Sequence, residues 1–115
     1  MRLRVKLPGA DKVEIDERKV RAYLLSRTHP VGRFKARVFA ALGFDEVAWP
    51  ALVSELRRIA LVGEVDEVKD FEFGRKYTVP GELKGPVGSA QVLTVWIQLK
   101  GQAGVRLVTV RPRWP

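Results

Sequence analysis

The chain has 115 residues, of which 46% are hydrophobic, and it carries a formal net charge of +8 at pH 7. This length suits one domain with a single core, which we expect to span residues 1–115, and its apolar runs are too short to cross a bilayer. Cysteine is absent, which excludes disulfides, thiolate metal sites and cysteine nucleophiles.

The first segment, "RLRVKLP", alternates basic and apolar residues. This period of two predicts a half-buried strand over residues 2–7 that ends at Pro8. The alternation also lacks the continuous apolar stretch of about 7–15 residues that defines a secretory signal. We therefore expect a cytoplasmic protein. Asparagine is absent and glutamine is rare, a composition typical of thermophiles.

Apolar spacing of about 3.6 residues predicts three helices in the first half of the chain. The first runs from an N-cap at Asp16 to about Ser26, and the second lies between Pro30 and a stop at Gly43. The third begins near Trp49–Pro50, because an interior proline is poorly tolerated, and it ends at Gly63. Its buried stripe is predicted to contain Leu52, Leu56 and Ile59.

After Gly63 the pattern changes to strands separated by glycine or proline. We predict strands within residues 64–73, 75–80, 90–99 and 105–112, with a hairpin at Phe73-Gly74-Arg75 and a loop over residues 80–89. The expected fold is α+β, in which an N-terminal strand and three helices pack on one face of a C-terminal antiparallel sheet of about four strands.

The two faces of the last two strands are assigned from their apolar content. Leu93, Val95, Ile97 and Leu99 form a wholly apolar set, so we expect them to face the helices and Val92, Thr94, Trp96 and Gln98 to lie opposite. In the final strand the same reasoning places Val108 and Val110 inward and Leu107, Thr109 and Arg111 on the opposite face. That opposite face is then mixed, aromatic and basic.

Basic residues concentrate around the first two predicted helices. Residues 17–37 contain one acid, Glu17, and seven cations: Arg18, Lys19, Arg21, Arg27, Arg33, Lys35 and Arg37. Such a distribution favours a polyanionic partner, for which we consider RNA and an acidic antitoxin-like protein. A basic protein without any such partner is the alternative.

Lys35 lies on the apolar side of the second predicted helix, whereas Arg33 and Arg37 lie on the solvated side. Its stem can pack on the core while the ammonium reaches water. Alternatively, Lys35 lines a cleft beside the helix N-terminus, where an ammonium and backbone amides hold a phosphate. The sequence leaves both interpretations open.

His29 is the only histidine, and it stands at or just before the start of the same helix. A capping or packing role is one interpretation. Acid–base chemistry is the other, because imidazole is the one side chain here that titrates near neutral pH without a shifted pKa. With a single histidine, no cysteine and no glycine-rich phosphate motif, we expect no metal site and no cofactor.

The segments "KLPGADKVEIDERKVRAYLLSRTHPVGRFKARVFAALGF", "GRKYTVPGELKGP" and "TVWIQL" with "RLVTVRP" resemble a small bacterial domain family of unknown function. That family occurs in polymorphic-toxin and toxin–antitoxin contexts, and His-Pro-x-Gly-Arg-x-Lys-Ala is the most specific part of the resemblance. The order of elements is also similar to the barnase–RelE-like ribonuclease fold. Family members often carry a second histidine where this chain has Phe34, which we interpret as a core residue.

The resemblance implies a metal-independent ribonuclease of toxin type, in which a ribose 2′-OH attacks the adjacent phosphate. His29 is the candidate general acid or base, and Lys35 the group that stabilises phosphoryl charge. The candidate substrate-binding residues are Arg33, Arg37, Thr109, Arg111, Trp96, which could stack a base, and Tyr77, a reserve proton donor or a plain strand-face aromatic.

Two other functions remain open at the level of sequence. One is a non-catalytic basic module that binds RNA or an acidic antitoxin-like protein through the same surfaces. The other is a homo-oligomer, such as a homodimer, that buries Trp96 and Trp114 and has no role with nucleic acid.

Overall fold

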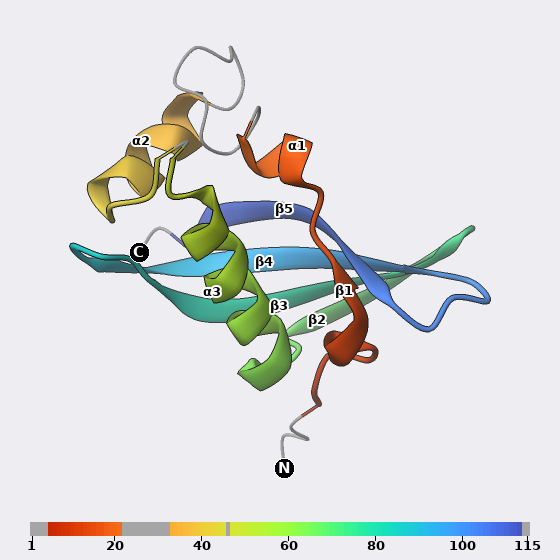
Figure 1. The fold of residues 1–115 in the computed structure, drawn as a ribbon. Coiled ribbons are helices and arrows are strands. Elements are labelled where there is room, and N and C mark those ends of the chain that lie inside the picture. Colours follow the sequence, from red (N-terminus) through yellow and green to blue (C-terminus); the bar gives the residue numbers. More distant parts are fainter. Residues whose placement is uncertain (1–4, 22–32, 46, 114–115) are drawn as a thin grey trace.

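The computed structural model describes residues 5–21, 33–45 and 47–113, and the side chains of all of these except 33–36. It has the expected α+β architecture, in which helices cover one face of a five-stranded sheet (Figure 1). The elements are η1 (Ala10–Lys12), β1 (Val13–Glu14), α1 (Glu17–Lys19), α2 (Arg33–Ala41), α3 (Trp49–Val62), β2 (Glu67–Phe71), β3 (Gly74–Lys84), β4 (Ser89–Leu99) and β5 (Val105–Pro112).

The strands lie in the order β1-β5-β4-β3-β2. The four strands β2 to β5 pair with one another in antiparallel fashion, as predicted. The short β1 pairs in parallel with β5, which makes the sheet mixed. The predicted strand over residues 2–7 is wrong in its described part, where Lys6 forms only an isolated bridge with Glu64. The N-terminal strand therefore begins later than its alternating sequence indicates.

Local signals at the helix ends are confirmed wherever the structure describes them. The Asp16 carboxylate caps α1 by accepting a hydrogen bond from the Arg18 backbone N–H at 2.8 Å. Gly43 follows α2 with φ of 96°, a conformation that favours glycine. Pro50 lies in the first turn of α3, and Gly63 is its C-cap. The predicted ends near Ser26 and Pro30 lie outside the described residues.

The face assignment of β4 is wrong. Val92, Thr94 and Trp96 are fully buried under the helices, in one core with Leu52, Leu56 and Ile59 of α3. Leu93, Ile97 and Leu99 lie on the opposite face and are half-buried. The helical side takes the largest side chain of the strand, because Trp96 contributes the most apolar area to the core.

A buried hydrogen-bond chain makes this arrangement possible. The Trp96 indole Nε1–H donates to the Thr94 hydroxyl at 2.8 Å, and that hydroxyl donates to the Val79 carbonyl of β3 at 2.7 Å. Thr94 is the only buried polar residue in the described part of the chain. Its hydroxyl both donates and accepts, and no buried side-chain nitrogen or oxygen among the described residues lacks a hydrogen-bond partner.

The predicted inward and outward faces of β5 are half right. Val110 faces the core as expected, but Leu107 is also buried there. The reason is a register shift, since Val95 pairs with Thr109 while Trp96 pairs with Leu107. Val108 is therefore the extra residue of a bulge, which changes the face of the strand before it. Thr109 and Arg111 keep their predicted place opposite the helices.

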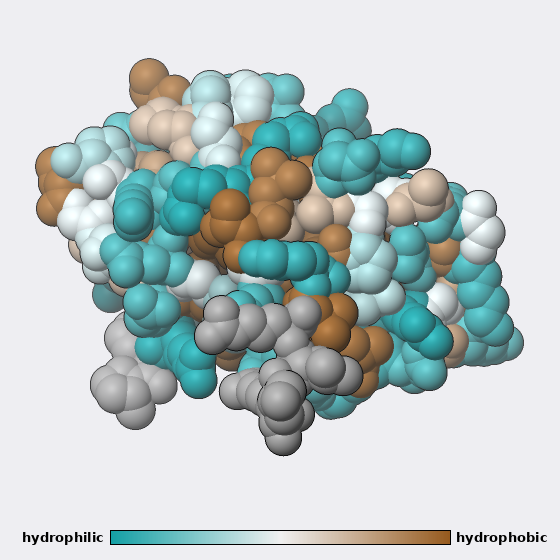
Figure 2. All heavy atoms as spheres, turned by 90° about the horizontal axis from the view of Figure 1, so that it is seen from below, coloured by the Kyte–Doolittle hydropathy of each residue, from teal (hydrophilic) through white to brown (hydrophobic). Residues whose placement is uncertain are grey.

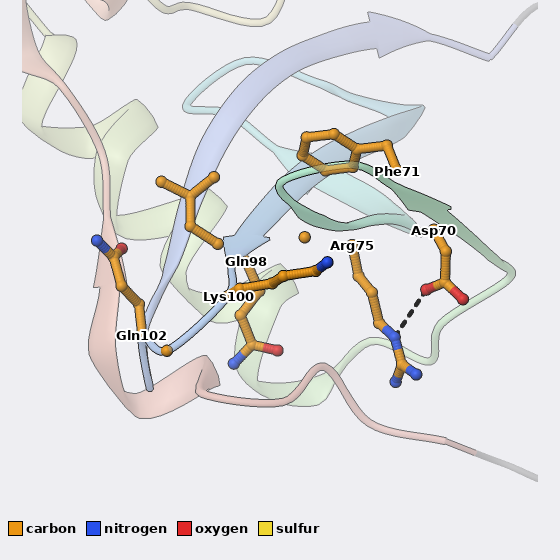
Figure 3. Close-up of a pocket in the computed structure, with 9 residues that line it drawn as sticks. Asp70, Phe71, Arg75, Gln98, Lys100 and Gln102 are labelled. Carbon is orange, nitrogen blue, oxygen red and sulfur yellow. Dashed lines mark hydrogen bonds and ion pairs between the residues drawn. The ribbon is translucent and has the colours of Figure 1, made fainter.

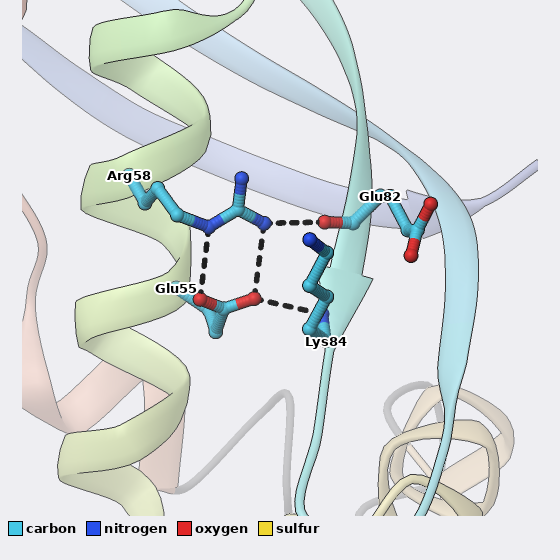
Figure 4. A network of polar contacts seen from close by, with 4 residues as sticks. All are labelled: Glu55, Arg58, Glu82 and Lys84. Atoms are coloured by element: carbon cyan, nitrogen blue, oxygen red, sulfur yellow. Dashed lines mark hydrogen bonds and ion pairs between the residues drawn. The ribbon is translucent and has the colours of Figure 1, made fainter.

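Strand β3 runs through the segment predicted as a loop, and residues 80–84 belong to it. Beyond Thr78, no strand in the described part of the chain pairs with β3 on the β2 side. Pro80 has no N–H to leave unpaired at this edge. Arg58 of α3 donates to the Glu82 carbonyl at 2.6 Å, and Glu55 accepts from the Lys84 N–H at 2.7 Å (Figure 4). Side chains of α3 thus complete the free edge of the sheet.

Glu55 and Arg58 also bind each other through two hydrogen bonds of 3.0 Å. The Arg58 guanidinium and the Lys84 N–H hold the pKa of Glu55 below its ordinary value of 4.5, although burial acts in the opposite direction. A carboxylate with a lowered pKa stabilises the fold above its ordinary pKa, and this contribution is lost as the pH falls through the lowered value.

We expect Glu55→Gln to lower the free energy of unfolding at neutral pH by about 1–2 kcal/mol, because the bidentate ion pair is lost. The difference from the wild type should shrink as the pH falls from the ordinary pKa of 4.5 through the lowered value, because the carboxyl is protonated first in the unfolded state and last in the folded state. Urea unfolding over a pH series measures both effects. Glu82→Gln is the control and should have the smaller effect, because only its backbone carbonyl is hydrogen-bonded in the network and its carboxylate acts on Arg58 through charge alone. A difference that is constant with pH would contradict this account.

Thr94→Val keeps the β-branched shape but removes the hydroxyl between Trp96 and Val79. We expect the free energy of unfolding to fall by about 1–3 kcal/mol, because the indole N–H is left unpaired in the core. The control is Thr78→Val, the same substitution on the opposite face of the sheet, which should change it by less than about 0.5 kcal/mol. An equal change in the free energy of unfolding for the two substitutions would disprove a special role for the buried hydrogen bonds of Thr94.

Candidate nucleic-acid interface

The face of the sheet opposite the helices is exposed in the described part of the molecule, and we call it the open face (Figure 1). Its centre is a hollow of about 280 Å³. Side chains from four strands line this hollow: Glu67 and Lys69 of β2, Lys76 and Thr78 of β3, Val95 of β4, and Val108, Thr109 and Arg111 of β5. Strand register brings them together, since Glu67, Thr78, Val95 and Thr109 form one cross-strand row.

Positive charge predominates on the open face. Lys69 pairs with Glu67 at 3.1 Å, and Arg106, farther along β5, pairs with Glu14 at 3.2 Å. Lys76 and Arg111 form no ion pair with any residue that the structure describes. These two side chains are therefore the cations best able to bind an external anion, on either side of the hollow.

The floor of the hollow is apolar. Val95 is only 5% exposed and lines it together with Val108, between the lysine and arginine side chains. The half-buried Leu93 and Ile97 extend this apolar strip along β4. A cationic rim around an apolar strip can bind a molecule that has both anionic and flat apolar parts, as single-stranded nucleic acids do.

The predicted substrate-binding residues separate into two groups. Thr109 and Arg111 line the hollow on the open face, as expected. Trp96 and Tyr77 lie on the helical side, where they are 0% and 4% exposed. The prediction that Trp96 stacks a base is therefore wrong, because its ring is enclosed by the core. Tyr77 is a buried strand-face aromatic rather than an accessible proton donor.

The predicted catalytic residues are described incompletely. His29 lies outside the described residues, and so do the side chains of Arg33 and Lys35, although both belong to α2. Arg37 is exposed on α2. Because α2 lies in the helical layer, Arg37 is on the other side of the sheet from Thr109 and Arg111 (Figure 1). The structure does not combine these three residues into one surface.

Lys69 and Lys76 are residues of the open-face hollow that the sequence prediction missed. Both lie on the open side of the β2–β3 hairpin, where Lys69 pairs with Lys76 across the strands. The hairpin itself was predicted correctly from Phe73-Gly74-Arg75. Extending its period-two alternation on both sides would have found the two lysines, since cross-strand neighbours share a face.

A second hollow, which we call the strand-end pocket, lies where the β2–β3 hairpin meets the turn after β4 (Figure 3). Its volume is about 510 Å³, and it is lined by Asp70, Phe71, Gly74, Arg75, Gln98, Leu99, Lys100, Gly101 and Gln102. Arg75 Nε donates to Asp70 at 2.7 Å. The Tyr77 hydroxyl and the Asp70 carboxylate raise the pKa of Arg75, so the guanidinium stays charged.

Exposed hydrophobic side chains are scattered elsewhere on the molecule. Figure 2 shows hydrophobic patches between hydrophilic side chains on the side that faces down in Figure 1. Leu61 and Val62 at the end of α3 are about half exposed, as is Val68 of β2. The expected oligomer interface through Trp96 is wrong, because that residue is in the core, and Trp114 lies outside the described residues.

Two kinds of structure are absent from the described residues, a membrane-spanning helix and a cluster of metal ligands. None of their helices has the length and hydropathy needed to span a membrane. Likewise, no group of three or more histidine, aspartate or glutamate side chains within these ranges is arranged to hold a metal ion.

Comparison with known proteins identified a matching family and a solved structure of similar fold. Residues 6–113 match the family described as "Domain of unknown function (DUF6883)". The fold is similar to that of a chain from the "Contact-dependent growth inhibition toxin - immunity protein complex from Klebsiella pneumoniae 342", with a TM-score of 0.69 and 15% identity. The match covers 86% of this chain and 98% of that one. No curated protein matches the sequence. At this identity the likeness shows a shared fold.

Because Lys76 and Arg111 lie on the open face outside the core, we expect Lys76→Gln and Arg111→Gln, singly and together, to preserve the fold. The free energy of unfolding should change by less than about 0.5 kcal/mol per substitution. Trp96→Ala should instead lower it by about 3–5 kcal/mol. Thermal and urea unfolding test this contrast. A large loss in the charge variants would show that these cations serve the fold.

Proposed function

We propose that this chain, which belongs to the family of the domain of unknown function DUF6883, is a toxin-type domain that binds single-stranded RNA on its open face and cleaves it without a metal ion. The observation that carries the proposal is the hollow between Lys76 and Arg111, with its apolar floor and with no helix over it in the described part of the chain. A net charge of +8 adds long-range attraction for a polyanion.

The hollow suits a flexible strand better than a rigid duplex. Lys69 and Lys76 lie on one side of the apolar strip and Arg111 on the other, so phosphates can follow the rim while bases contact the strip. Thr109 lines the same hollow with a hydroxyl that can bind a phosphate or a ribose oxygen. Exposed bases are what single-stranded RNA offers and duplex RNA conceals.

For cleavage, we propose that RNA extending beyond the open face reaches the segment around the start of α2, where His29 acts as general acid or base. A base removes the proton from a ribose 2′-OH, the 2′-oxygen bonds to the adjacent phosphorus, and the 5′-oxygen leaves with a proton from an acid. This produces a 2′,3′-cyclic phosphate and a 5′-hydroxyl end. Lys35 would stabilise the negative charge on the phosphoryl oxygens, and Arg33 and Arg37 would supply the surrounding positive field. The support is chemical, since His29 is the only histidine.

The structural neighbour supports a toxin-like or immunity-like role, because it comes from a complex of a toxin with its immunity protein. A protein partner is therefore part of the proposal, and the charge of this chain favours an acidic one. A second candidate function follows from the apolar floor around Val95: a non-catalytic module that binds such a partner on the open face.

We expect Lys76→Gln with Arg111→Gln to weaken binding of a single-stranded RNA and to reduce the salt dependence of that binding. Each lost phosphate contact should lower the slope of log K against log salt by about 0.7. Fluorescence anisotropy at several salt concentrations measures both quantities. The matched control is Arg18→Gln with Lys19→Gln, which removes the same charge from α1 in the helical layer. Equal losses in the two double variants would show a diffuse charge effect and would reject the open face as the binding site.

The nuclease proposal is tested with total RNA in the presence of EDTA. We expect the wild type to cleave it, and His29→Ala and Lys35→Ala to lose cleavage while they keep RNA binding. Binding without cleavage by the wild type would support the binding module instead. If the wild type neither binds nor cleaves RNA at low salt, both nucleic-acid functions are wrong, and loss of cleavage on adding EDTA would refute metal independence.

A further inference from the structure

The open face carries a smaller hollow at the side where β1 joins the sheet, which we call the β1 hollow. Its volume is about 90 Å³, and the residues that line it include Lys12, Glu14, Ile97, Leu99, Gln102 and Arg106. Strand register confirms the face, because Ile97 pairs with Arg106 and Arg106 pairs with Glu14. Leu99 follows Ile97 by two residues and shares its face.

One cross-strand row joins the β1 hollow to the larger open-face hollow. The row crosses all five strands through Lys69, Lys76, Ile97, Arg106 and Glu14. The first two of these residues line the larger hollow, and the last three line the β1 hollow. Ile97 also follows Val95 on the same face of β4, about 7 Å farther along the strand. The apolar strip of β4 therefore runs from one hollow into the other.

Two cations line the β1 hollow. Arg106 donates from Nε to the Glu14 carboxylate at 3.2 Å, which leaves the other N–H groups of the guanidinium as donors. Lys12 forms no ion pair with any residue that the structure describes. Glu14 offsets one of the two positive charges, so the hollow keeps a positive balance. An ammonium beside a guanidinium suits a phosphate group.

The size of the β1 hollow selects a small group. Sites that enclose a whole small molecule have volumes of about 300 Å³ or more. At about 90 Å³, this hollow suits a single phosphate better than a base with its ribose. The bases of a bound strand would then lie over the apolar strip, and the phosphate would enter the hollow beside it.

The backbone around Lys12 is packed too closely to leave the hollow loosely formed. A Cβ atom at Gly104 would meet the Lys12 carbonyl, and a Cβ atom at Gly9 would meet the Ala103 carbonyl. The segment η1 and the turn after β4 therefore touch through their backbones, which only glycine permits. This contact places Lys12 beside the ends of β4 and β5 before a ligand arrives, which lowers the entropy cost of binding.

The turn after β4 directs its polar side chains to different places. In Figure 3, Gln102 lies beside the β1 segment, whereas Lys100 of the same turn extends toward Arg75. Gln102 lines the β1 hollow and adds an amide donor to it, and Lys100 does not line it. Lys100 is thus a nearby exposed cation outside the hollow, which makes it a matched control.

We propose that the β1 hollow is a second phosphate subsite, in which Lys12 and Arg106 bind a backbone phosphate of an RNA strand that follows β4 out of the larger hollow. This subsite rests on the proposed binding of RNA to the open face, and it extends that binding surface across Ile97 to β1.

The experiment measures binding of an oligouridylate of about eight nucleotides by fluorescence anisotropy over a range of salt concentrations. Lys12→Gln should weaken binding about tenfold at low salt and lower the slope of log K against log salt by about 0.7, because one phosphate contact is lost. Lys12→Arg should retain the affinity, since it keeps the charge. Lys100→Gln, the matched control, should change the affinity by less than about twofold.

A double variant tests whether one RNA strand contacts both hollows. Lys12→Gln with Lys76→Gln should lower the slope by about 1.4, the sum of the two single losses. A slope equal to that of Lys76→Gln alone would contradict the subsite.

The failures of the subsite and of the proposed function are distinguishable. If Lys12→Gln binds like the wild type, or if Lys100→Gln weakens binding as much, the β1 hollow is not a phosphate subsite. Weaker binding by Lys76→Gln would in that case still support the open face as the RNA-binding surface. If the wild type does not bind the oligouridylate at low salt, the proposed function itself is wrong. Circular dichroism of each variant checks that these exposed substitutions leave the sheet folded.

Discussion

The hydrogen-bond chain from Trp96 through Thr94 to the Val79 carbonyl is the constraint on which the two faces of the sheet depend. It lets the helical side accept an indole and a hydroxyl without an unpaired polar atom. Once Trp96 points inward, the alternation of β4 places Leu93, Val95 and Ile97 on the other face. The core therefore determines that the open face has an apolar floor, and with it the kind of ligand that can bind there.

The helical layer also protects the edge of the sheet. Without Glu55 and Arg58, the free backbone groups of Glu82 and Lys84 would be available to pair with another strand. Pro80 removes one donor from the same edge, and α3 satisfies the other two groups. With this edge closed, the open face is left as the broad surface of the sheet where a partner or a substrate can bind. The same ion-pair network thus stabilises the fold and closes this edge to pairing with another strand.

The open face combines cations with an apolar strip. Lys76, Arg111 and Thr109 can hold a phosphate backbone beside that strip. Because Trp96 is buried in the core, the apolar strip is the surface of this face that unpaired bases can contact. The proposed chemistry of His29 and Lys35 belongs to the segment around the start of α2, so substrate binding and cleavage draw on different elements of the fold.

The sequence by itself determined the features that depend on nearby residues. The cap at Asp16, the stop at Gly43, both ends of α3 and the β2–β3 hairpin follow from local backbone chemistry, as does the overall α+β class. Only the tertiary structure decided which face of β4 is buried, because both of its faces are largely apolar and the choice depends on how well Trp96 packs against distant helices. The extension of β3 through Pro80, the bulge at Val108 and the meeting of Lys76 with Arg111 were decided in the same way. Each depends on partners far away in the sequence, and local patterns do not record those partners.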